Sequence, residues 1–262
     1  MMILQTERLS MSFGGIRALD DVSLSVQAGI VFSIIGPNGA GKTTLFNLIS
    51  GLHTPPDGRV RLAGQDVTGF APHRLARLGL SRTFQNLQIF FRMTALENVM
   101  VGRHRHEGTG ILADVLHLPA VDRQNRKTRK AACDALARVG LSVAADRPAG
   151  TLPYGALKRL EIARALASEP GVLLLDEPAA GCNPVETQEL NSIIRSIVKD
   201  GMTVMLIEHD MRLVMNISDR IHVLSNGRTL AEGTPAEVRS NSEVMEAYLG
   251  VRTVKGLAYA VG

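Results

Sequence analysis

The fold is decided by one stretch of the sequence, Gly36-Pro37-Asn38-Gly39-Ala40-Gly41-Lys42-Thr43, which fits the pattern GxxxxGK[ST]. It follows an apolar run at residues 30–35 and opens a segment of helical periodicity at residues 42–50. Glycines let such a loop curl so that successive backbone N–H groups face a phosphate, and the positive end of the following helix points at the same place. We therefore expect a strand, a phosphate-binding loop and a helix, in this order.

Two side chains at the end of this loop carry the expected chemistry. Lys42 would reach the β- and γ-phosphates of a nucleotide, and the Thr43 hydroxyl would bind Mg²⁺, whose oxygen shell is completed largely by phosphates and waters. A plain glycine-rich turn is the alternative. The position of the motif between a buried strand and a helix favours phosphate binding.

Apolar runs rich in branched residues alternate with helical segments along the chain. The strand-like runs are residues 22–26, 30–35, 172–175 and 204–207, and the helical segments include 42–50 and 186–198. Strands that are apolar throughout are typical of parallel sheets covered on both faces. We expect an α/β fold of the P-loop NTPase type, with a mixed central sheet flanked by helices. Turn signals at residues 14–15 and 55–58 predict an antiparallel β edge.

Other parts of the chain have patterns different from the alternating strands and helices of this core. Strand-like runs give way to helix signals between residues 85 and 165, including a helix at residues 126–139 closed by Gly140, which predicts an inserted helical subdomain. Asn226-Gly227 predicts a tight hairpin between residues 220–225 and 228–231. The expected division is a nucleotide-binding α/β core in two parts (1–84 and 166–250), the helical subdomain (85–165) and a C-terminal tail (251–262).

Composition excludes several other classes of protein. With 262 residues, 45% hydrophobic and 21% charged, the chain is neither disordered nor of low complexity. A formal charge of only +4 is too mild to predict a nucleic-acid binder. Cys133 and Cys182 lack the spacing of a disulfide framework or a zinc site. Because neither a signal peptide nor an apolar run of about 18 residues is found, we expect a cytosolic protein.

Two adjacent carboxylates follow the run at residues 172–175. Since side chains alternate along a strand, Asp176 and Glu177 are expected to point in different directions. Asp176 would then hold Mg²⁺ through water, and Glu177 would polarise the water that attacks the γ-phosphate. The alternative is an ordinary acidic strand end that caps a turn at Pro178, and the phosphate loop disfavours it.

His209 follows the run at residues 204–207. A lone histidine at a strand end is usually structural. Here it is expected at the same carboxyl edge of the sheet as the phosphate loop, where open α/β sheets bind their ligands. This position makes His209 a candidate for contact with the γ-phosphate.

Over nearly its full length the chain resembles the ATP-binding subunits of ABC transporters. Six motifs in family order carry this resemblance: Walker A at residues 36–44, the Q-loop at Gln85, the signature LPYGA at 152–156, Walker B at 173–177, the D-loop AGCN at 180–183 and the switch histidine at His209.

The resemblance implies a role for each motif residue. The implied ATP contacts are Phe13, Gly36, Pro37, Asn38, Gly39, Ala40, Gly41, Lys42, Thr43, Thr44, Tyr154 and Gly155. The implied Mg²⁺ ligands are Thr43, Gln85 and Asp176, and the implied catalytic residues are Glu177, His209 and Gln85. Phe13 would stack on the adenine, and a place in the core is its alternative.

More narrowly, the chain is similar to the LivG-type ATPase of branched-chain amino acid importers. Four stretches carry this likeness: Tyr154 followed by RLEIAR at 159–164, DEPAAG at 176–181, IEHDM at 207–211 and AYLG at 247–250. The likeness implies ATP-driven import at the inner face of the membrane. The implied partners are transmembrane permease subunits, a second, identical or different ATP-binding subunit and, indirectly, an external solute-binding protein.

Other functions share parts of this pattern. Urea importers and lipopolysaccharide-export ATPases carry several of the same stretches. A soluble ABC protein acting on DNA or ribosomes is the alternative from another class. The interval between Lys42 and Asp176 fits a compact subdomain rather than a long coiled coil, and the chain has one cassette rather than two. Because both observations disfavour the class that acts on DNA or ribosomes, no nucleic-acid partner is expected. A P-loop GTPase is disfavoured because the NKxD motif is missing.

The signature departs from the family pattern LSGGQ. Pro153 has neither a hydroxyl nor an N–H group, and Ala156 replaces glutamine. Gly155 and the N-terminus of the following helix remain as an anion site. We therefore expect a weak homodimer and a more active pair with a subunit that carries the standard signature.

The remaining features are expected on surfaces. Phe90 and Phe91 follow the Q-loop, where the family has its groove for the permease coupling helix, and core packing is their alternative. Residues 103–106 (RHRH) predict a solvated loop rather than a metal site, and Cys182 is predicted to pack rather than to sense redox state. A basic run predicts a wet helix face that would meet anionic headgroups under a membrane: Arg123, Arg126, Lys127, Arg129 and Lys130.

Overall fold

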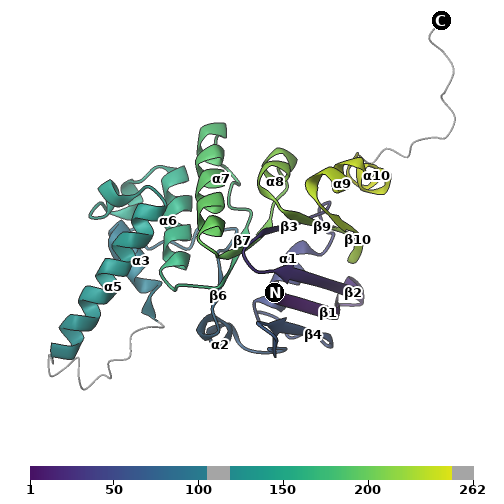
Figure 1. Ribbon diagram of the computed structural model, residues 1–262, viewed down its shortest axis with the longest axis horizontal. Coiled ribbons are helices and arrows are strands. Elements are labelled where there is room, and N and C mark those ends of the chain that lie inside the picture. The colour runs from purple at the N-terminus through teal and green to yellow at the C-terminus, as the bar shows by residue number, and fades with distance from the viewer. Residues whose placement is uncertain (105–118, 250–262) are drawn as a thin grey trace, which may run out of the picture.

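A six-stranded sheet forms the centre of the molecule. The computed structural model describes residues 1–104 and 119–249 (Figure 1). The strand order is β10-β9-β3-β8-β7-β6. The members are β3 (Val31–Ile35), β6 (Leu80–Arg82), β7 (Val172–Asp176), β8 (Thr203–Ile207), β9 (Arg220–Ser225) and β10 (Arg228–Gly233). All neighbours pair in parallel except β9 and β10, so the predicted mixed central sheet is confirmed.

The three middle strands are apolar because both of their faces are covered. Every residue of β3, β7 and β8 is buried. On one face pack α7 (Pro184–Lys199) and α8 (Met211–Ile217), through residues such as Ile194 and Leu213. On the other face lies α1 (Lys42–Ile49), through Leu45 and Phe46. Figure 1 shows α7 and α8 above the sheet and α1 below it.

A second, antiparallel sheet covers α1 from outside, as the turn signals near the N-terminus predict. Its strand order is β2-β1-β4-β5. The members are β1 (Met2–Phe13), β2 (Ile16–Gln27), β4 (Asp57–Leu62) and β5 (Gln65–Asp66). Strand β4 already begins at Asp57, so the turn expected at residues 55–58 is shorter than predicted.

A group of helices between β6 and β7 lies at one end of the molecule (Figure 1). It contains α3 (Ala95–Val101), α5 (Pro119–Arg138) and α6 (Tyr154–Leu166), with two 3₁₀ turns at Ser142–Ala144 and Ala149–Thr151. Helix α5 begins seven residues before the predicted start at residue 126. Proline is well tolerated in a first helical turn, where its missing N–H needs no partner, and the polar residues that follow give no apolar periodicity to detect.

The remaining helices are short and lie at the surface. They are α2 (Pro72–Arg77), α9 (Pro235–Ser240) and α10 (Ser242–Leu249). The predicted hairpin between β9 and β10 is confirmed, with positive φ values of 48° at Asn226 and 76° at Gly227, which suit the tight turns of hairpins. Across the described ranges, no helix combines the length and apolar character that a membrane span requires.

Candidate active site

The carboxyl ends of four neighbouring strands bring the predicted motifs together. In the order β3-β8-β7-β6, the strands lead into the phosphate loop, His209, Glu177 and Gln85. Parallel strands end at the same edge of a sheet, and open α/β sheets use this edge for ligands. Four segments far apart in the sequence therefore meet at one edge.

The phosphate loop needs glycine for conformation and for space. Gly36 and Gly41 have φ values of 156° and 101°. A Cβ on Gly36 would lie 2.2 Å from the Leu224 carbonyl oxygen, and one on Gly41 would lie 2.5 Å from that of Ala18. The loop is also tied to the β9–β10 turn, since the Gly227 N–H donates to the Ala40 carbonyl at 3.1 Å. The backbone at Ala18 on one side and at Leu224 on the other therefore limits the space available to the loop.

Lys42 opens α1 and turns back over this loop. Its Nζ donates to the carbonyl oxygens of Gly36 at 2.7 Å and of Pro37 at 3.0 Å. Burial lowers the pKa of Lys42, and the nearby carboxylates of Glu177 and Asp176 oppose this change. A phosphate in the loop would give this partly desolvated ammonium a strong charged partner.

Glu177 lies between Gln85 and His209. Gln85 Nε2 donates to Glu177 Oε2 at 3.0 Å, and His209 Nδ1 lies 3.8 Å from the same oxygen. Glu177 has a φ of 48°, which is uncommon for a residue with a Cβ, and its N–H donates to the Ile207 carbonyl at 2.9 Å. The backbone therefore holds this carboxylate toward the amide and the imidazole.

Asp176 has a different set of partners from Glu177, which lies after the end of β7. Its side chain is buried, and Oδ2 accepts a hydrogen bond from Arg82 Nη2 at 2.8 Å. The Asp176 N–H also approaches the Thr83 hydroxyl at 3.4 Å. Both partners come from β6 or the residue after it, so Asp176 is held from the strand that leads to Gln85.

Glu208 is a buried acid that sequence reasoning missed. Its oxygens accept from the backbone N–H groups of Ala179 at 2.9 Å and His209 at 3.1 Å. Burial raises the pKa of Glu208, and these hydrogen bonds act against that change. An acid next to a histidine at a strand end gives no sequence signal of burial. The side chain joins the segment after Glu177 to the segment that carries His209.

The signature at residues 152–156 lies beside the D-loop. The Tyr154 hydroxyl donates to the Ala180 carbonyl at 3.2 Å. A Cβ on Gly155 would lie 2.4 Å from the Glu186 side chain, so glycine lets α6 approach the start of α7. Pro153 is the N-cap of α6 and makes no side-chain capping hydrogen bond. The implied nucleotide contacts of Tyr154 and Gly155 stay a prediction.

Three charged residues of α6, also missed from the sequence, hold the Q-loop backbone. Lys158 Nζ donates to the Gln85 carbonyl at 3.2 Å, and Arg164 Nη1 donates to the Gln88 carbonyl. Burial raises the pKa of Glu161, opposed by Lys158 and Arg164 and by backbone hydrogen bonds from the Q-loop segment. Their spacing of three residues places them on one helix face. The helix that begins at the signature is thus joined to the Q-loop.

The three phenylalanines for which core packing was the alternative lie outside the core. Phe13 is 44% exposed, and its ring packs edge-on against His53 with centroids 5.5 Å apart. Phe90 and Phe91 are 48% and 52% exposed. The core alternatives for these residues are therefore wrong.

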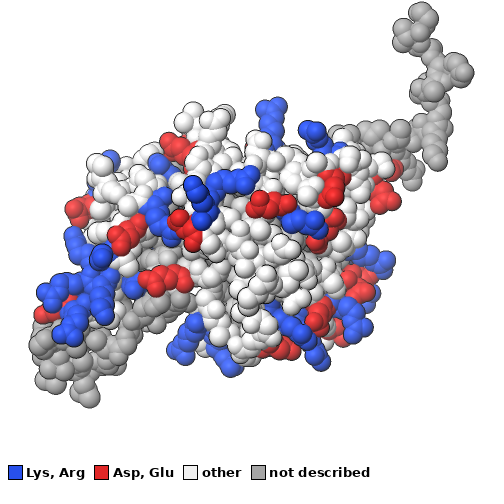
Figure 2. Space-filling view, in the orientation of Figure 1, with Lys and Arg blue, Asp and Glu red and all other residues white. Residues whose placement is uncertain are grey.

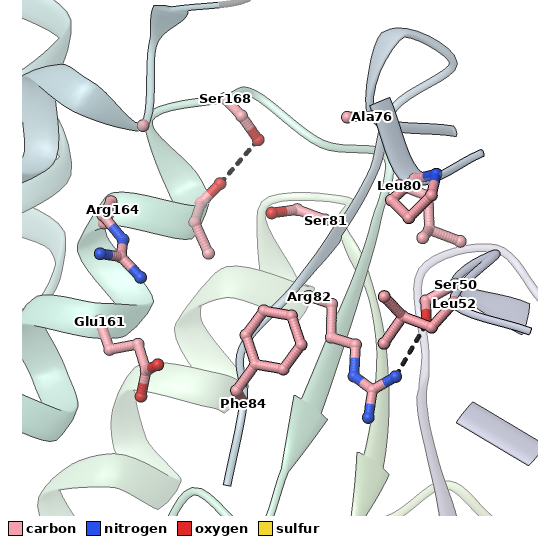
Figure 3. Close-up of a pocket in the computed structure, with 13 residues that line it drawn as sticks. Ser50, Leu52, Ala76, Leu80, Ser81, Arg82, Phe84, Glu161, Arg164 and Ser168 are labelled. Atoms are coloured by element: carbon pink, nitrogen blue, oxygen red, sulfur yellow. Dashed lines mark hydrogen bonds between the residues drawn. The ribbon is translucent and has the colours of Figure 1, made fainter. Parts of the chain in front are cut away.

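A groove opens beside the site, between α2, β6 and α6 (Figure 3). It has a volume of about 290 Å³, and its wall includes Arg82, Phe84, Glu161 and Arg164. A second groove of about 410 Å³ is lined by Phe84, Arg164 and Phe90 among others. The shared residues Phe84 and Arg164 make the two grooves neighbours.

Two other surface predictions have mixed outcomes. Arg103 does not belong to a solvated loop, because its side chain is mostly buried and forms an ion pair with Glu169 at 2.6 Å. The neighbouring Arg105 and His106 lie outside the described residues. The basic run on α5 is exposed as predicted, and Figure 2 shows Lys and Arg side chains gathered over this helix.

The cysteine prediction agrees with the structure. Cys182 packs partly buried against the core, and this burial raises the pKa of its thiol. A raised thiol pKa lowers the fraction of reactive thiolate. Packing is thus the better description of this residue.

Comparisons with known proteins agree with this architecture. The ABC transporter family model matches residues 19–180, and the model of the branched-chain amino acid ATP-binding cassette transporter matches residues 228–253. The chain is 48% identical to the high-affinity branched-chain amino acid transport ATP-binding protein BraF of Pseudomonas aeruginosa, over 95% of this chain and 98% of that protein. It is 44% identical to the corresponding protein LivG of Escherichia coli K12, with the same coverage.

Solved structures of ATP-binding cassettes have the same fold as this chain. A nucleotide-free ATP-binding cassette from an ABC transporter superposes with a TM-score of 0.83 at 36% identity, covering 96% of this chain and all of that one (100%). An ADP conformation of such a cassette superposes with a TM-score of 0.84, at the same identity and coverage. With its P-loop, sheet order and long sequence matches, the chain belongs to the ABC transporter family, among the ATP-binding proteins of branched-chain amino acid transport.

Proposed function

We propose that this chain is the ATP-hydrolysing subunit of an importer of branched-chain amino acids. The observation that carries the proposal is the meeting of Gln85, Glu177 and His209 at the sheet edge that also holds the phosphate loop. The relatives whose names state branched-chain amino acid transport align over 95% of the chain, which supports the choice of solute.

Nucleotide binding would begin in the loop at residues 36–44. Backbone N–H groups of the loop and the N-terminus of α1 would take the phosphates, as helix N-termini commonly do. Lys42 would exchange its two loop carbonyls for phosphate oxygens, which are stronger acceptors for an ammonium. Phe13 is exposed apart from its edge contact with His53, and it would stack on the adenine.

The donor set beside the loop fits Mg²⁺. Thr43 offers a hydroxyl, and Asp176 has one carboxylate oxygen engaged by Arg82. Gln85 uses its Nε2 toward Glu177, which leaves the amide carbonyl as an oxygen ligand. Hard oxygen donors of this kind suit a small divalent cation. When bound, Mg²⁺ supplies positive charge to the β- and γ-phosphate oxygens.

Hydrolysis would use the carboxylate that faces the ligand edge. Glu177 polarises the attacking water, His209 contacts the γ-phosphate, and Gln85 orients the Glu177 oxygen that both neighbours approach. Gln85 therefore has two roles, one at the metal and one at the base. The backbone strain at Glu177 is consistent with a side chain held for a reaction.

A second ATP-binding subunit, identical or different, would complete the site. The signature residues Pro153, Tyr154 and Gly155 would face the nucleotide held by that subunit. In this arrangement residues 1–84 and 166–250 form the nucleotide-binding core, residues 85–165 form the helical subdomain, and residues 251–262 follow as a tail. Because Pro153 supplies neither hydroxyl nor N–H, a partner with a standard signature would give the more active pair.

Transmembrane permease subunits would dock in the two adjoining grooves. Phe84 and Phe90 are exposed and apolar, and exposed apolar patches mark interaction sites. The docked subunit would sit at the inner face of the membrane, and an external solute-binding protein would act through the permease.

Co-purification from detergent-solubilised membranes, followed by uptake in proteoliposomes, tests this proposal. We expect permease subunits to co-purify, and the reconstituted complex, supplied with the external solute-binding protein, to take up leucine, isoleucine or valine with ATP inside. Urea uptake serves as the control for the related importer class. Uptake of urea alone, or recovery of the chain with no membrane subunit, would contradict the proposal.

A further inference from the structure

Arg82 joins two separate parts of the site with a single guanidinium group. Its Nη1 donates to Asn47 Oδ1 and to the Ser50 hydroxyl, both at 2.8 Å, and its Nη2 donates to Asp176 Oδ2, also at 2.8 Å. Asn47 and Ser50 belong to α1 and its C-cap, and Asp176 ends β7. The arginine itself ends β6, three residues before Gln85.

The environment of Arg82 holds this group in one orientation. The side chain is only 7% exposed, and a buried charge is tolerated only when it is paired and hydrogen bonded. The guanidinium carbon lies 5.5 Å from the Phe46 ring centroid and 5.4 Å from that of Phe84. A planar fork between rings suits arginine, whereas a lysine ammonium could not reach all three acceptors in this geometry.

The two elements that Arg82 joins carry the two ends of the proposed metal site. Helix α1 begins with Lys42 and Thr43, and β7 ends with Asp176. The distance between the Thr43 hydroxyl and the Asp176 carboxylate therefore depends on how α1 sits relative to β7. Arg82 is a direct side-chain link between them.

We propose that Arg82 is a positioning residue that holds Asp176 at Oδ2, presents the other carboxylate oxygen to Mg²⁺, and ties this carboxylate to the groove wall. The proposal rests on the proposed function, which supplies Mg²⁺ and the docking partner. Groups that orient metal ligands in this way commonly affect metal affinity by about 10- to 100-fold.

Arg82 also connects Asp176 to the wall of the groove. Arg82 and Phe84 both line the groove of about 290 Å³. Figure 3 shows the Phe84 ring beside Arg82, with Glu161 and Arg164 of α6 across from them. A permease segment seated in the groove would press on Phe84, and the neighbouring guanidinium would carry the displacement to Asp176.

The test measures how Mg²⁺ changes nucleotide binding to the isolated chain. A fluorescent, non-hydrolysable ATP analogue is titrated in EDTA and then at rising Mg²⁺ concentrations. For Arg82→Met and Arg82→Lys we expect affinities in EDTA close to that of the unaltered chain, and a Mg²⁺ midpoint raised by about 10-fold or more. A normal midpoint in Arg82→Lys would show that charge alone suffices and would overturn the positioning role.

Matched variants separate this effect from a general loss of packing. Arg103→Met removes another mostly buried arginine, paired with Glu169, and should leave the Mg²⁺ midpoint unchanged. If Arg82→Met fails to fold, Asn47→Ala removes only one of its acceptors and should shift the midpoint in the same direction by a smaller factor. An unshifted midpoint in Asn47→Ala, with a normal melting temperature, would count against the proposal.

A second pair of variants tests the tie to the groove. Phe84→Ala removes one ring that makes a cation–π contact with Arg82 and should raise the midpoint moderately, whereas Phe70→Ala removes the ring in contact with Arg74 and should leave it unchanged. An equal response in the two variants would overturn the tie. If the unaltered chain itself shows no Mg²⁺-enhanced binding, the proposed function fails. A normal response in that chain with no shift at Arg82 refutes this inference alone.

Discussion

The Nε2 of Gln85 donates to Oε2 of Glu177 at 3.0 Å, across 92 positions of sequence. The contact exists because β6 and β7 are neighbouring parallel strands in a register that places Arg82 opposite Leu174, so that positions 85 and 177, three residues further on, are level with each other. It engages one oxygen of the candidate base and leaves the other oxygen for water. Movement of the Q-loop would therefore break this hydrogen bond or shift the Glu177 carboxylate.

Glu177→Gln is expected to stop hydrolysis and to preserve binding. The change removes the base at almost constant size, and such a step is worth about 10²- to 10⁴-fold in rate. Size-exclusion chromatography with MgATP, with the partner subunit if the homodimer is weak, should show a nucleotide-dependent dimer. Glu189→Gln, on the outer side of α7, is the matched control. Rapid hydrolysis by the variant would assign the base elsewhere, with His209 as the first candidate.

Lys42→Ala is expected to abolish turnover with little change in melting temperature. Hydrogen bonds from a charged donor contribute about 1.5 to 3 kcal/mol each, and removing the partly buried ammonium offsets much of that loss because its desolvation cost disappears as well. ATP binding by fluorescence and thermal unfolding are measured together. Lys199→Ala, in the last turn of α7, controls for loss of a lysine. Normal turnover in the variant would disprove the phosphate-binding role.

Gly155→Ala is expected to cost about 1 kcal/mol of unfolding free energy. The new Cβ would displace the Glu186 side chain, which forms a capping box with Asn183 at the start of α7. Urea unfolding measures the loss. Gly171→Ala is the control, because the nearest atom to its Cβ would be 3.9 Å away. In a Glu186→Ala background the Gly155 substitution should cost almost nothing more; additivity would refute the explanation.

Pro153→Ser is expected to raise ATP turnover of the isolated chain. It restores the family hydroxyl and also supplies an N-cap to α6, which is worth about 1 kcal/mol of stability. Ala71→Ser adds a similar N-cap to α2 and controls for stability alone. Turnover and ATP-induced dimerisation are measured for both. Equal turnover in the two variants would remove the case for Pro153 as the weak point of the homodimer.

Glu208→Gln is expected to make stability less dependent on pH. Because burial raises the folded-state pKa above its ordinary value of 4.5, the stabilising contribution is complete below that value and is lost as the pH rises through the folded-state pKa. The neighbouring His209, whose Nδ1 lies 3.7 Å from Glu208 Oε2, acts against the rise in the pKa of Glu208. Melting temperatures from pH 4.5 to 8 should fall less in the variant than in the unaltered chain. Glu243→Gln on exposed α10 should keep the original slope.

Individual loops and strands could be predicted from the sequence, but the order in which distant strands pair in the sheet could not. Residues 36–43 and the apolar run of β7 carry their own signals, since loop chemistry and burial act on neighbouring residues. The position of β6 beside β7 carries none, because β6 has only three residues and its partner lies about ninety positions away. The Gln85–Glu177 contact therefore needed the structure.

Tertiary packing also determines which site residues have no signal in the sequence. Arg82 and Glu208 look like ordinary polar residues in sequence, and only tertiary packing buries them. Lys158 and Glu161 sit at a visible helical spacing, yet their partner is a loop backbone that no periodicity identifies. A charged residue that binds backbone groups gives no sequence motif, because every residue type has the same backbone N–H and carbonyl groups, proline apart.

The contacts around the phosphate loop set an order of events during synthesis. The loop at residues 36–41 contacts both ends of the chain. The carbonyl oxygen of Ala18, near the start, lies close to it, as does that of Leu224, near the end, and the Gly227 N–H donates a hydrogen bond to it. Such distant pairings form late, because the entropy of closing a long loop must be overcome first. A nascent chain that has not yet released residue 227 from the ribosome should lack a finished phosphate cradle, so we expect nucleotide binding only after this residue has emerged.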